Sequence, residues 1–228
     1  MNQSLNIARI KRVANALNGL NAKVVFVGGA TISLYPDRPV SEVRPTEDID
    51  VIVAIIGYSE RAALEEKLRS IGFRHDIESK VVCRYRIDEI VVDIMPTDDN
   101  SIGFSNRWYV EGFEKSIVYV IDEETKIDIL SPPFFLATKL EAHKGRGKDD
   151  GRSSQDFEDI VFVLENRESI WNEMNDANGN LKNYFKEEFR ILMANPNLFE
   201  WIDCHVERGS APATDRIMAQ IKKFIDSE

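Results

Sequence analysis

The segment from Asp48 to Val53, DIDVIV, is an apolar run of β-branched residues with two carboxylates at its start. β-branched residues favour strands, and side chains two apart on a strand point to the same side of a sheet. We therefore expect Asp48 and Asp50 to project together, while Ile49 and Val51 face the core. Such close carboxylates repel one another, and Mg²⁺, which takes few protein ligands, would remove the repulsion. The alternative is a solvated strand start that carries two acids.

A third carboxylate, Asp93, lies in another apolar run, IVVDIMP at residues 90–96. An unpaired acid is costly to bury, so Asp93 is expected either to meet a cation or to lie at a strand end in solvent. If its strand lies beside that of Asp48 and Asp50, three carboxylates converge, as a two-metal phosphoryl or nucleotidyl transfer site requires. In such a site the third acid can also take the proton of the attacking hydroxyl.

Two glycines, Gly28 and Gly29, follow a predicted strand at residues 23–27 and precede a predicted helix that begins GATISLY. Glycines between a strand and a helix let backbone amides approach a phosphate, and a helix N-terminus favours anions. Thr31 or Ser33 would add a hydroxyl donor. A glycine pair alone usually marks only a turn. A glycine pair, then an Asp-x-Asp strand and then a lone strand aspartate is a much more specific pattern.

The character of the chain changes near residue 130. Before this point, β-branched runs alternate with helical periods, and the runs on either side of Asp88 and Glu89 are expected to form a hairpin. After it, helical periodicity dominates. The expected fold is therefore α/β, with a small mixed β-sheet core and flanking helices over residues 1–130 and a helical C-terminal region over residues 131–228.

The order of these motifs resembles that of the polymerase-β-like nucleotidyltransferase superfamily. The sequence RPTEDIDV at residues 44–51 resembles the corresponding motif in the AbiE-type and MenT-like toxin branch of this superfamily. That branch also carries a lysine on a helix after the sheet and an aspartate on the next helix, and Lys139 and Asp156 stand in those places. The resemblance extends from the predicted strand before the glycine pair to the helix that carries Asp156.

The resemblance implies a nucleotidyltransferase core that moves a nucleoside monophosphate from a nucleoside triphosphate, such as ATP, to an acceptor hydroxyl. It implies Mg²⁺, or Mn²⁺, as the cofactor. By analogy the acceptor is a tRNA 3′ end, which would make the protein a toxin neutralised by an antitoxin partner. The resemblance implies that the metal ligands and catalytic acids are Asp48, Asp50 and Asp93. It implies that Lys139 is a catalytic cation that also contacts phosphate. The implied nucleotide-binding residues are Gly28, Gly29, Ser33, Thr46 and Asp156.

Several of these residues have structural alternatives. Lys139 lies in an apolar helical stripe, where a lysine commonly extends its ammonium to solvent. Asp156 either orients Lys139, touches the nucleotide or belongs to a solvated helix face. Thr46 either reaches the nucleotide or orders the loop before the aspartates. The alternating Arg84 and Arg86 are expected on the exposed face of their strand.

The net charge of the chain limits which chemical classes of acceptor molecule it is expected to bind. The 228 residues carry 29 basic and 39 acidic side chains, and the net charge of −10 argues against broad nonspecific binding to nucleic acid. It suits a cationic acceptor, so an enzyme that modifies an aminoglycoside or lincosamide antibiotic is the alternative to a tRNA-directed toxin. A noncatalytic module that keeps the fold to bind a partner is the third possibility.

The remaining features concern the compartment. The N-terminus has no signal-peptide core, and no apolar run approaches transmembrane length. We therefore expect a cytoplasmic protein with no membrane partner. Cys83 and Cys204 have neither a disulfide-framework nor a metal-ligand spacing, and we expect buried or inert thiols.

Overall fold

The structure, a computed structural model, describes residues 2–40, 43–54, 58–97, 106–147, 150–207 and 212–227. The chain divides into two compact units. The first comprises Met1–Leu34 and Ser41–Ser131, and the second comprises Tyr35–Val40 and Pro132–Glu228. Among the described residues, no helix is both long enough and apolar enough to cross a membrane.

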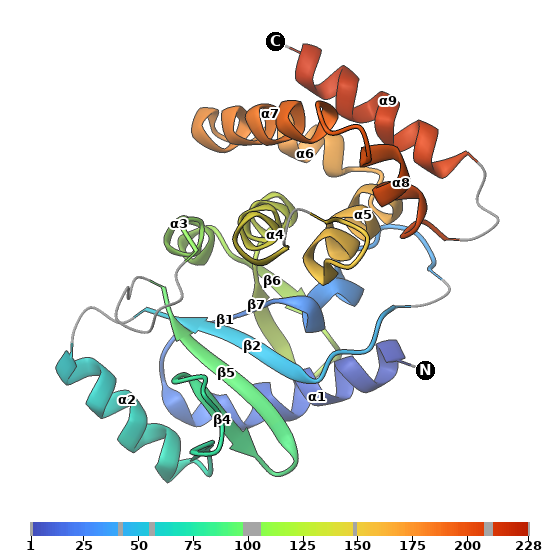
Figure 1. Ribbon diagram of the computed structural model, residues 1–228. Helices are drawn as coiled ribbons and strands as arrows, with labels where there is room; N and C mark the ends of the chain where they lie inside the picture. The colour runs from blue at the N-terminus through green and yellow to red at the C-terminus, as the bar shows by residue number, and fades with distance from the viewer. Residues whose placement is uncertain are drawn as a thin grey trace. The chain divides into compact units, whose positions relative to one another are not determined.

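The first unit is built on one seven-stranded sheet, with the order β3-β4-β5-β2-β1-β7-β6 (Figure 1). Its strands are β1 (Val24–Val27), β2 (Asp48–Val53), β3 (Arg74–His75), β4 (Arg84–Ile87), β5 (Ile90–Pro96), β6 (Ile117–Val120) and β7 (Lys126–Ile129). The β1–β7 and β2–β5 pairs are parallel, and the others are antiparallel. The expected mixed sheet is therefore confirmed.

The central strands explain why this sheet is stable. In β2, Ile49 and Val51 are buried while Asp48 and Asp50 are only partly so, which confirms the predicted alternation. The neighbouring strand β1 buries Val25 beside them. Complete burial of one such aliphatic side chain contributes about 1.5–3 kcal/mol, so the buried face of the sheet fixes which side the carboxylates must take.

Helices flank this sheet within the first unit. They are α1 (Asn2–Leu17), the 3-10 helices η1 (Asn18–Leu20) and η2 (Gly29–Leu34), α2 (Tyr58–Ser70) and α3 (Tyr109–Glu114). Helix α1 packs against η2 and β2 and buries Ile10 and Val13. The helix expected after the glycine pair is a 3-10 helix, not an α-helix. The Thr31 amide bonds back three residues to the Gly28 carbonyl, and β-branched residues lower α-helix propensity.

The second unit is helical, as the periodicity predicts (Figure 1). It contains α4 (Pro132–Arg146), α5 (Gln155–Asn166), α6 (Ile170–Asn175), α7 (Gly179–Met193), α8 (Leu198–Asp203) and α9 (Ala213–Asp226). Helix α4 packs against α5, α6 and α7. Phe185 and Phe189 stack with centroids 6.1 Å apart, and Phe224 of α9 meets Phe189 edge-on at 5.8 Å.

The short segment Tyr35–Val40 belongs to this helical unit despite its early place in the chain. The Tyr35 ring packs 4.4 Å from that of Phe135. Arg167 donates from Nη1 to the Tyr35 carbonyl at 2.7 Å, and the Asp37 carboxylate accepts from the Ser169 amide at 3.0 Å. These bonds tie the segment to the start of α6.

Candidate functional site

Strand register brings three carboxylates together in the first unit. In the parallel pair of β2 and β5, Asp50 is the direct partner of Asp93. Asp48 lies two residues before Asp50 and therefore on the same face. One carboxylate oxygen from each residue lies within 4.8 Å of the other two, and these residues form a group that could hold a metal ion. Because Mg²⁺ prefers carboxylate oxygens and binds through few protein groups, the donor set fits that ion.

An arginine on the adjacent strand completes this cluster. Strand β4 is antiparallel to β5, and Arg84 is the cross-strand partner of Asp93. Its Nε donates to Asp93 Oδ1 at 2.8 Å, and its Nη2 donates to Asp93 Oδ2 at 2.7 Å and to Asp48 Oδ2 at 3.0 Å. Arg84 therefore does not lie on an exposed face as expected, since its side chain is only 25% exposed.

The charge of Arg84 is permanent. The hydrogen bond with Asp93 raises the pKa of the Arg84 guanidinium above its already high value, and the charges of Asp93 and Asp48 act in the same direction. A guanidinium in this setting does not lose its proton. Arg84 thus adds a fixed positive charge beside the three acids. Arg86, two residues further along β4, pairs instead with Asp76 at 2.8 Å.

The glycine pair makes room for side chains of the same unit. Gly28 has φ +71°, a conformation that L side chains rarely adopt, and a Cβ there would lie 2.0 Å from Asp50 Oδ2. At Gly29 a Cβ would lie 2.2 Å from Arg44 Nη2. The two positions are therefore glycine because the Asp50 carboxylate and the Arg44 guanidinium pass directly over the backbone.

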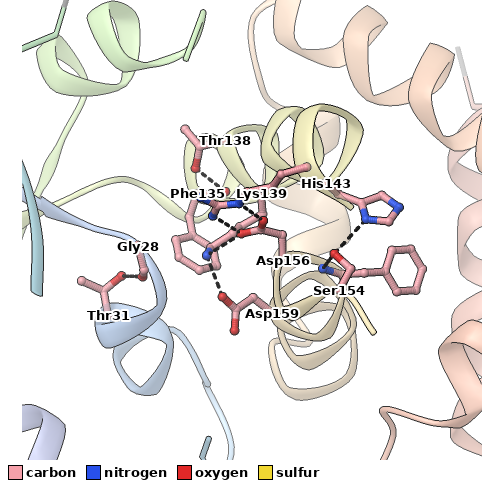
Figure 2. Close-up of polar contacts among 11 residues, drawn as sticks. Gly28, Thr31, Phe135, Thr138, Lys139, His143, Ser154, Asp156 and Asp159 are labelled. Atoms are coloured by element: carbon pink, nitrogen blue, oxygen red, sulfur yellow. Dashed lines mark hydrogen bonds and ion pairs between the residues drawn. The ribbon is translucent and has the colours of Figure 1, made fainter. Parts of the chain in front are cut away.

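The hydroxyls near the glycine pair have different surroundings. Thr31 donates from Oγ1 to the Gly28 carbonyl at 2.9 Å and so stabilises the turn (Figure 2). Ser33 is 5% exposed, and its Oγ has no hydrogen-bond partner among the residues that the structure describes. An unpaired buried hydroxyl is unfavourable, and it is the kind of group that a bound ligand would satisfy.

Thr46, in the loop before β2, is held by helix α1. Its Oγ1 donates to Asn6 Oδ1 at 3.2 Å, and its carbonyl accepts from Arg9 Nη1 at 2.7 Å. Asn6 is itself fully buried and donates to the Arg44 carbonyl at 3.5 Å. These contacts support the alternative in which Thr46 orders the loop that leads into the carboxylate strand.

In the helical unit, Lys139 of α4 lies between two aspartates of α5 (Figure 2). Its Nζ is 3.1 Å from Asp156 Oδ1 and 2.7 Å from Asp159 Oδ2. The lysine does not extend to solvent, since its side chain is 7% exposed. Burial acts to lower the pKa of Lys139, but the charges of Asp159 and Asp156 outweigh it and leave that pKa raised.

A second cation binds the outer side of Asp156. Arg146, at the end of α4, donates from Nε to Asp156 Oδ2 at 2.6 Å and from Nη2 to Asp156 Oδ1 at 2.9 Å. Burial acts to raise the pKa of Asp156, but the Arg146 hydrogen bond and the charge of Lys139 hold it below its usual range. The four charges compensate one another, and Asp156 is placed to orient Lys139.

Arg84 and Arg146 are two cations of these clusters that the sequence patterns did not predict as site residues. Arg84 was predictable in principle, because a two-residue turn at Asp88 and Glu89 pairs Ile87 with Ile90 and hence Arg84 with Asp93. No comparable signal pointed to Arg146, because its contact depends on how the two helices are joined.

Comparisons with known proteins concern the family and the fold of the chain. The family described as "Nucleotidyl transferase AbiEii toxin, Type IV TA system" matches residues 13–222. No curated protein matches the chain. Among solved structures, an antigenic nucleotidyltransferase-like protein from Paracoccidioides brasiliensis is similar at 14% identity and TM-score 0.50, over 89% of this chain and 94% of that one. The antibiotic-resistance factor ANT(2″)-Ia is similar at 16% identity and TM-score 0.51, over 85% and 97%. At these identities the structural likeness concerns the fold alone.

Proposed function

The chain belongs to the AbiEii nucleotidyl transferase toxin family, and from this premise we propose that it moves a nucleoside monophosphate from a nucleoside triphosphate to an acceptor hydroxyl with Mg²⁺ held by Asp48, Asp50 and Asp93. The observation that carries the proposal is the convergence of these three carboxylates, from two parallel strands, within 4.8 Å. Mn²⁺ would serve as a substitute, because it also takes carboxylate and water ligands.

Each acid has a proposed role in the transfer. Divalent cations bound there would activate the attacking hydroxyl and neutralise the leaving pyrophosphate. Asp48 and Asp50 act as ligands. Asp93, the most buried of the three, is a ligand and also accepts the proton of the attacking hydroxyl. The bond formed joins the acceptor oxygen to the α-phosphorus, and the bond broken releases pyrophosphate.

The remaining residues are proposed to hold the nucleotide. The Gly28–Gly29 turn offers backbone amides to the triphosphate, and Ser33 offers the hydroxyl that lacks a partner among the described residues. Lys139 supplies positive charge to the phosphates, with Asp156 as the residue that orients it. The anchoring of Thr46 by Asn6 favours an indirect role, in which Thr46 positions the loop before Asp48.

For the acceptor we propose a tRNA 3′ end in the cytoplasm, with an antitoxin protein that restrains the activity. The support is the family's description as a toxin of a toxin–antitoxin system. A cationic aminoglycoside is the second candidate acceptor, because the net charge of −10 would attract it. The similarity to ANT(2″)-Ia adds nothing to that candidate beyond the fold.

One experiment tests the function and separates the acceptors. Purified protein is incubated with Mg²⁺, each labelled nucleoside triphosphate in turn, and either total cellular RNA or an aminoglycoside. Wild type is compared with Asp50→Asn and with a control, Asp88→Asn. Asp88 is an exposed turn residue at φ +50° whose conformation asparagine tolerates.

The proposal predicts label in small RNA for wild type and Asp88→Asn, and none for Asp50→Asn. Label in the aminoglycoside alone would keep the nucleotidyl transfer and replace the acceptor. Equal labelling by wild type and Asp50→Asn would overturn the assignment of the site.

A further inference from the structure

We propose that Arg84 is a tethered counter-ion that competes with the divalent cation for Asp48 and Asp93, and so sets the metal concentration at which the site is filled. The inference rests on the proposed function, because it concerns the same three carboxylates. It assigns to Arg84 a regulatory role that neither the motifs nor the family comparison attaches to this residue.

The first support is the position of the guanidinium. Arg84 Nη2 lies 2.7 Å from Asp93 Oδ2 and 3.0 Å from Asp48 Oδ2, so one NH₂ group of the guanidinium bridges two of the three proposed ligands. Mg²⁺ binds its oxygen ligands at about 2.1 Å. A metal ion held by the same oxygens would meet both a steric obstacle and a like charge, so the guanidinium and the metal cannot share them.

The second support is that the fold positions the guanidinium at the carboxylates. The hairpin of β4 and β5 pairs Arg84 with Asp93, and β5 in turn pairs Asp93 with Asp50. Side chains that are direct neighbours across adjacent strands project from the same face of a sheet. The arginine is therefore placed beside the acids by the register itself.

The third support is that the contact can open. The side chains of Arg84 and Asp48 are 25% and 37% exposed, so the guanidinium can move to solvent without disturbing the core. The Asp48 half of the contact, at this exposure, contributes little net stability. Asp93 is 10% exposed, so its bidentate bonds to Arg84 are the stronger part that the metal must replace. The bidentate pair with Asp93 and the single bond to Asp48 are then replaced by bonds to a doubly charged ion, which neutralises the acids more completely than a monovalent guanidinium.

The size of the effect follows from the competition. The apparent affinity for metal is the intrinsic affinity multiplied by the fraction of molecules in which Arg84 has left the carboxylates. If the pair is closed in about nine molecules of ten, the metal binds about tenfold more weakly than it would without the arginine. A purely structural Arg84, which holds the carboxylates in place for the metal, would have the opposite effect on metal affinity.

The test measures metal binding directly. Mn²⁺ is titrated into wild type, Arg84→Gln and Arg86→Gln, and bound metal is followed by the loss of the free Mn²⁺ paramagnetic resonance signal. Arg86 is the matched control, because it lies on the same strand and face and has its own partner, Asp76, outside the cluster. Arg84→Lys keeps the positive charge but loses the planar guanidinium. It is a second variant that keeps the test valid if Arg84→Gln does not fold.

We expect Arg84→Gln to bind Mn²⁺ about tenfold more tightly than wild type, Arg84→Lys to fall between them, and Arg86→Gln to match wild type. Without metal, Arg84→Gln should melt at a lower temperature than wild type, because Asp48 and Asp93 then lack the Arg84 guanidinium. Saturating Mn²⁺ should raise its melting temperature by more than it raises that of wild type.

Two results would overturn the proposal, and only the second would also overturn the proposed metal site. Equal or weaker Mn²⁺ binding by Arg84→Gln would remove the competition but leave the metal site intact. An absence of Mn²⁺ binding by every variant and by wild type would overturn both the competition and the proposed metal site.

Discussion

The carboxylate of Asp50 lies directly over the backbone of Gly28, where a Cβ atom would be 2.0 Å from Oδ2. This contact links the glycine pair to the acid cluster. Gly28 also has φ +71°. Gly28→Ala should therefore displace Asp50 and strain the turn, with a loss of unfolding free energy of about 1–3 kcal/mol and a large loss of nucleotidyl transfer.

Urea denaturation and the labelled-nucleotide assay measure the two effects. Gly145→Ala is the control, because a Cβ at that position in α4 has no heavy atom within 4 Å and alanine favours a helix. Wild-type activity in Gly28→Ala would show that the position of Asp50 does not matter for the reaction.

Lys139 has a structural and a proposed catalytic role, and a double variant separates them. Lys139→Met leaves Asp159, which is 1% exposed, without the cation at 2.7 Å. Removing one member of a buried ion pair costs about 3–5 kcal/mol. Adding Asp159→Asn removes the buried negative charge that Lys139 faced and should restore much of the stability measured by denaturant unfolding. If Lys139 neutralises phosphate, the double variant stays inactive; recovered activity would make Lys139 purely structural.

The stability contributed by the Lys139 network should depend on pH in a defined way. The pKa of Asp156 is lowered in the folded state, so its contribution is complete above the ordinary pKa of about 3.9 and is lost as the pH falls through the folded value. The pKa of Lys139 is raised, so its contribution is complete below about 10.4 and is lost as the pH rises through the folded value.

The difference in unfolding free energy between wild type and Asp156→Asn should therefore be constant from about pH 5 to pH 9 and shrink below about pH 4. Denaturant titrations across that range measure it. A difference that grows on acidification would have the wrong sign for this network.

The two cysteines should react very differently with thiol reagents. Burial, together with the charge of nearby Asp93, raises the pKa of the Cys83 thiol to about 11, so about one thiol in a thousand is ionised at pH 8. Cys204 is exposed, so of the two alternatives in the expectation, buried or inert, burial does not apply to it. Iodoacetamide followed by peptide mass spectrometry should find Cys204 alkylated first; faster labelling of Cys83 would contradict its partly buried setting and raised pKa.

Sequence patterns predicted the fold class and the hairpin because both depend on local order. The β-branched runs and the turn at Asp88 and Glu89 specify β4 and β5, and these strands are present. The adjacency of β2 and β5 is different, because two strands and a helix separate them in sequence. The convergence of Asp93 with Asp48 and Asp50 could therefore be stated only as a condition, which the sheet order fulfils.

Other features depended on contacts that no periodicity reveals. The hydrogen bond from Thr46 to Asn6 joins residues 40 apart in sequence. The residues after Gly28 form a 3-10 helix, because the first turn closes on the Gly28 carbonyl three residues back. The ion pairs of Lys139 with Asp156 and Asp159 depend on the packing of α4 against α5. Local patterns thus located the acidic residues, whereas tertiary contacts decided which cations accompany them.

The most direct test of the central claim is an anomalous diffraction map from crystals grown with Mn²⁺ and a non-hydrolysable nucleoside triphosphate analogue. The account predicts a manganese peak within bonding distance of carboxylate oxygens from Asp48, Asp50 and Asp93, with the Arg84 guanidinium no longer bridging Asp48 and Asp93. Bound nucleotide with manganese elsewhere, or with no peak at these three residues, would contradict it.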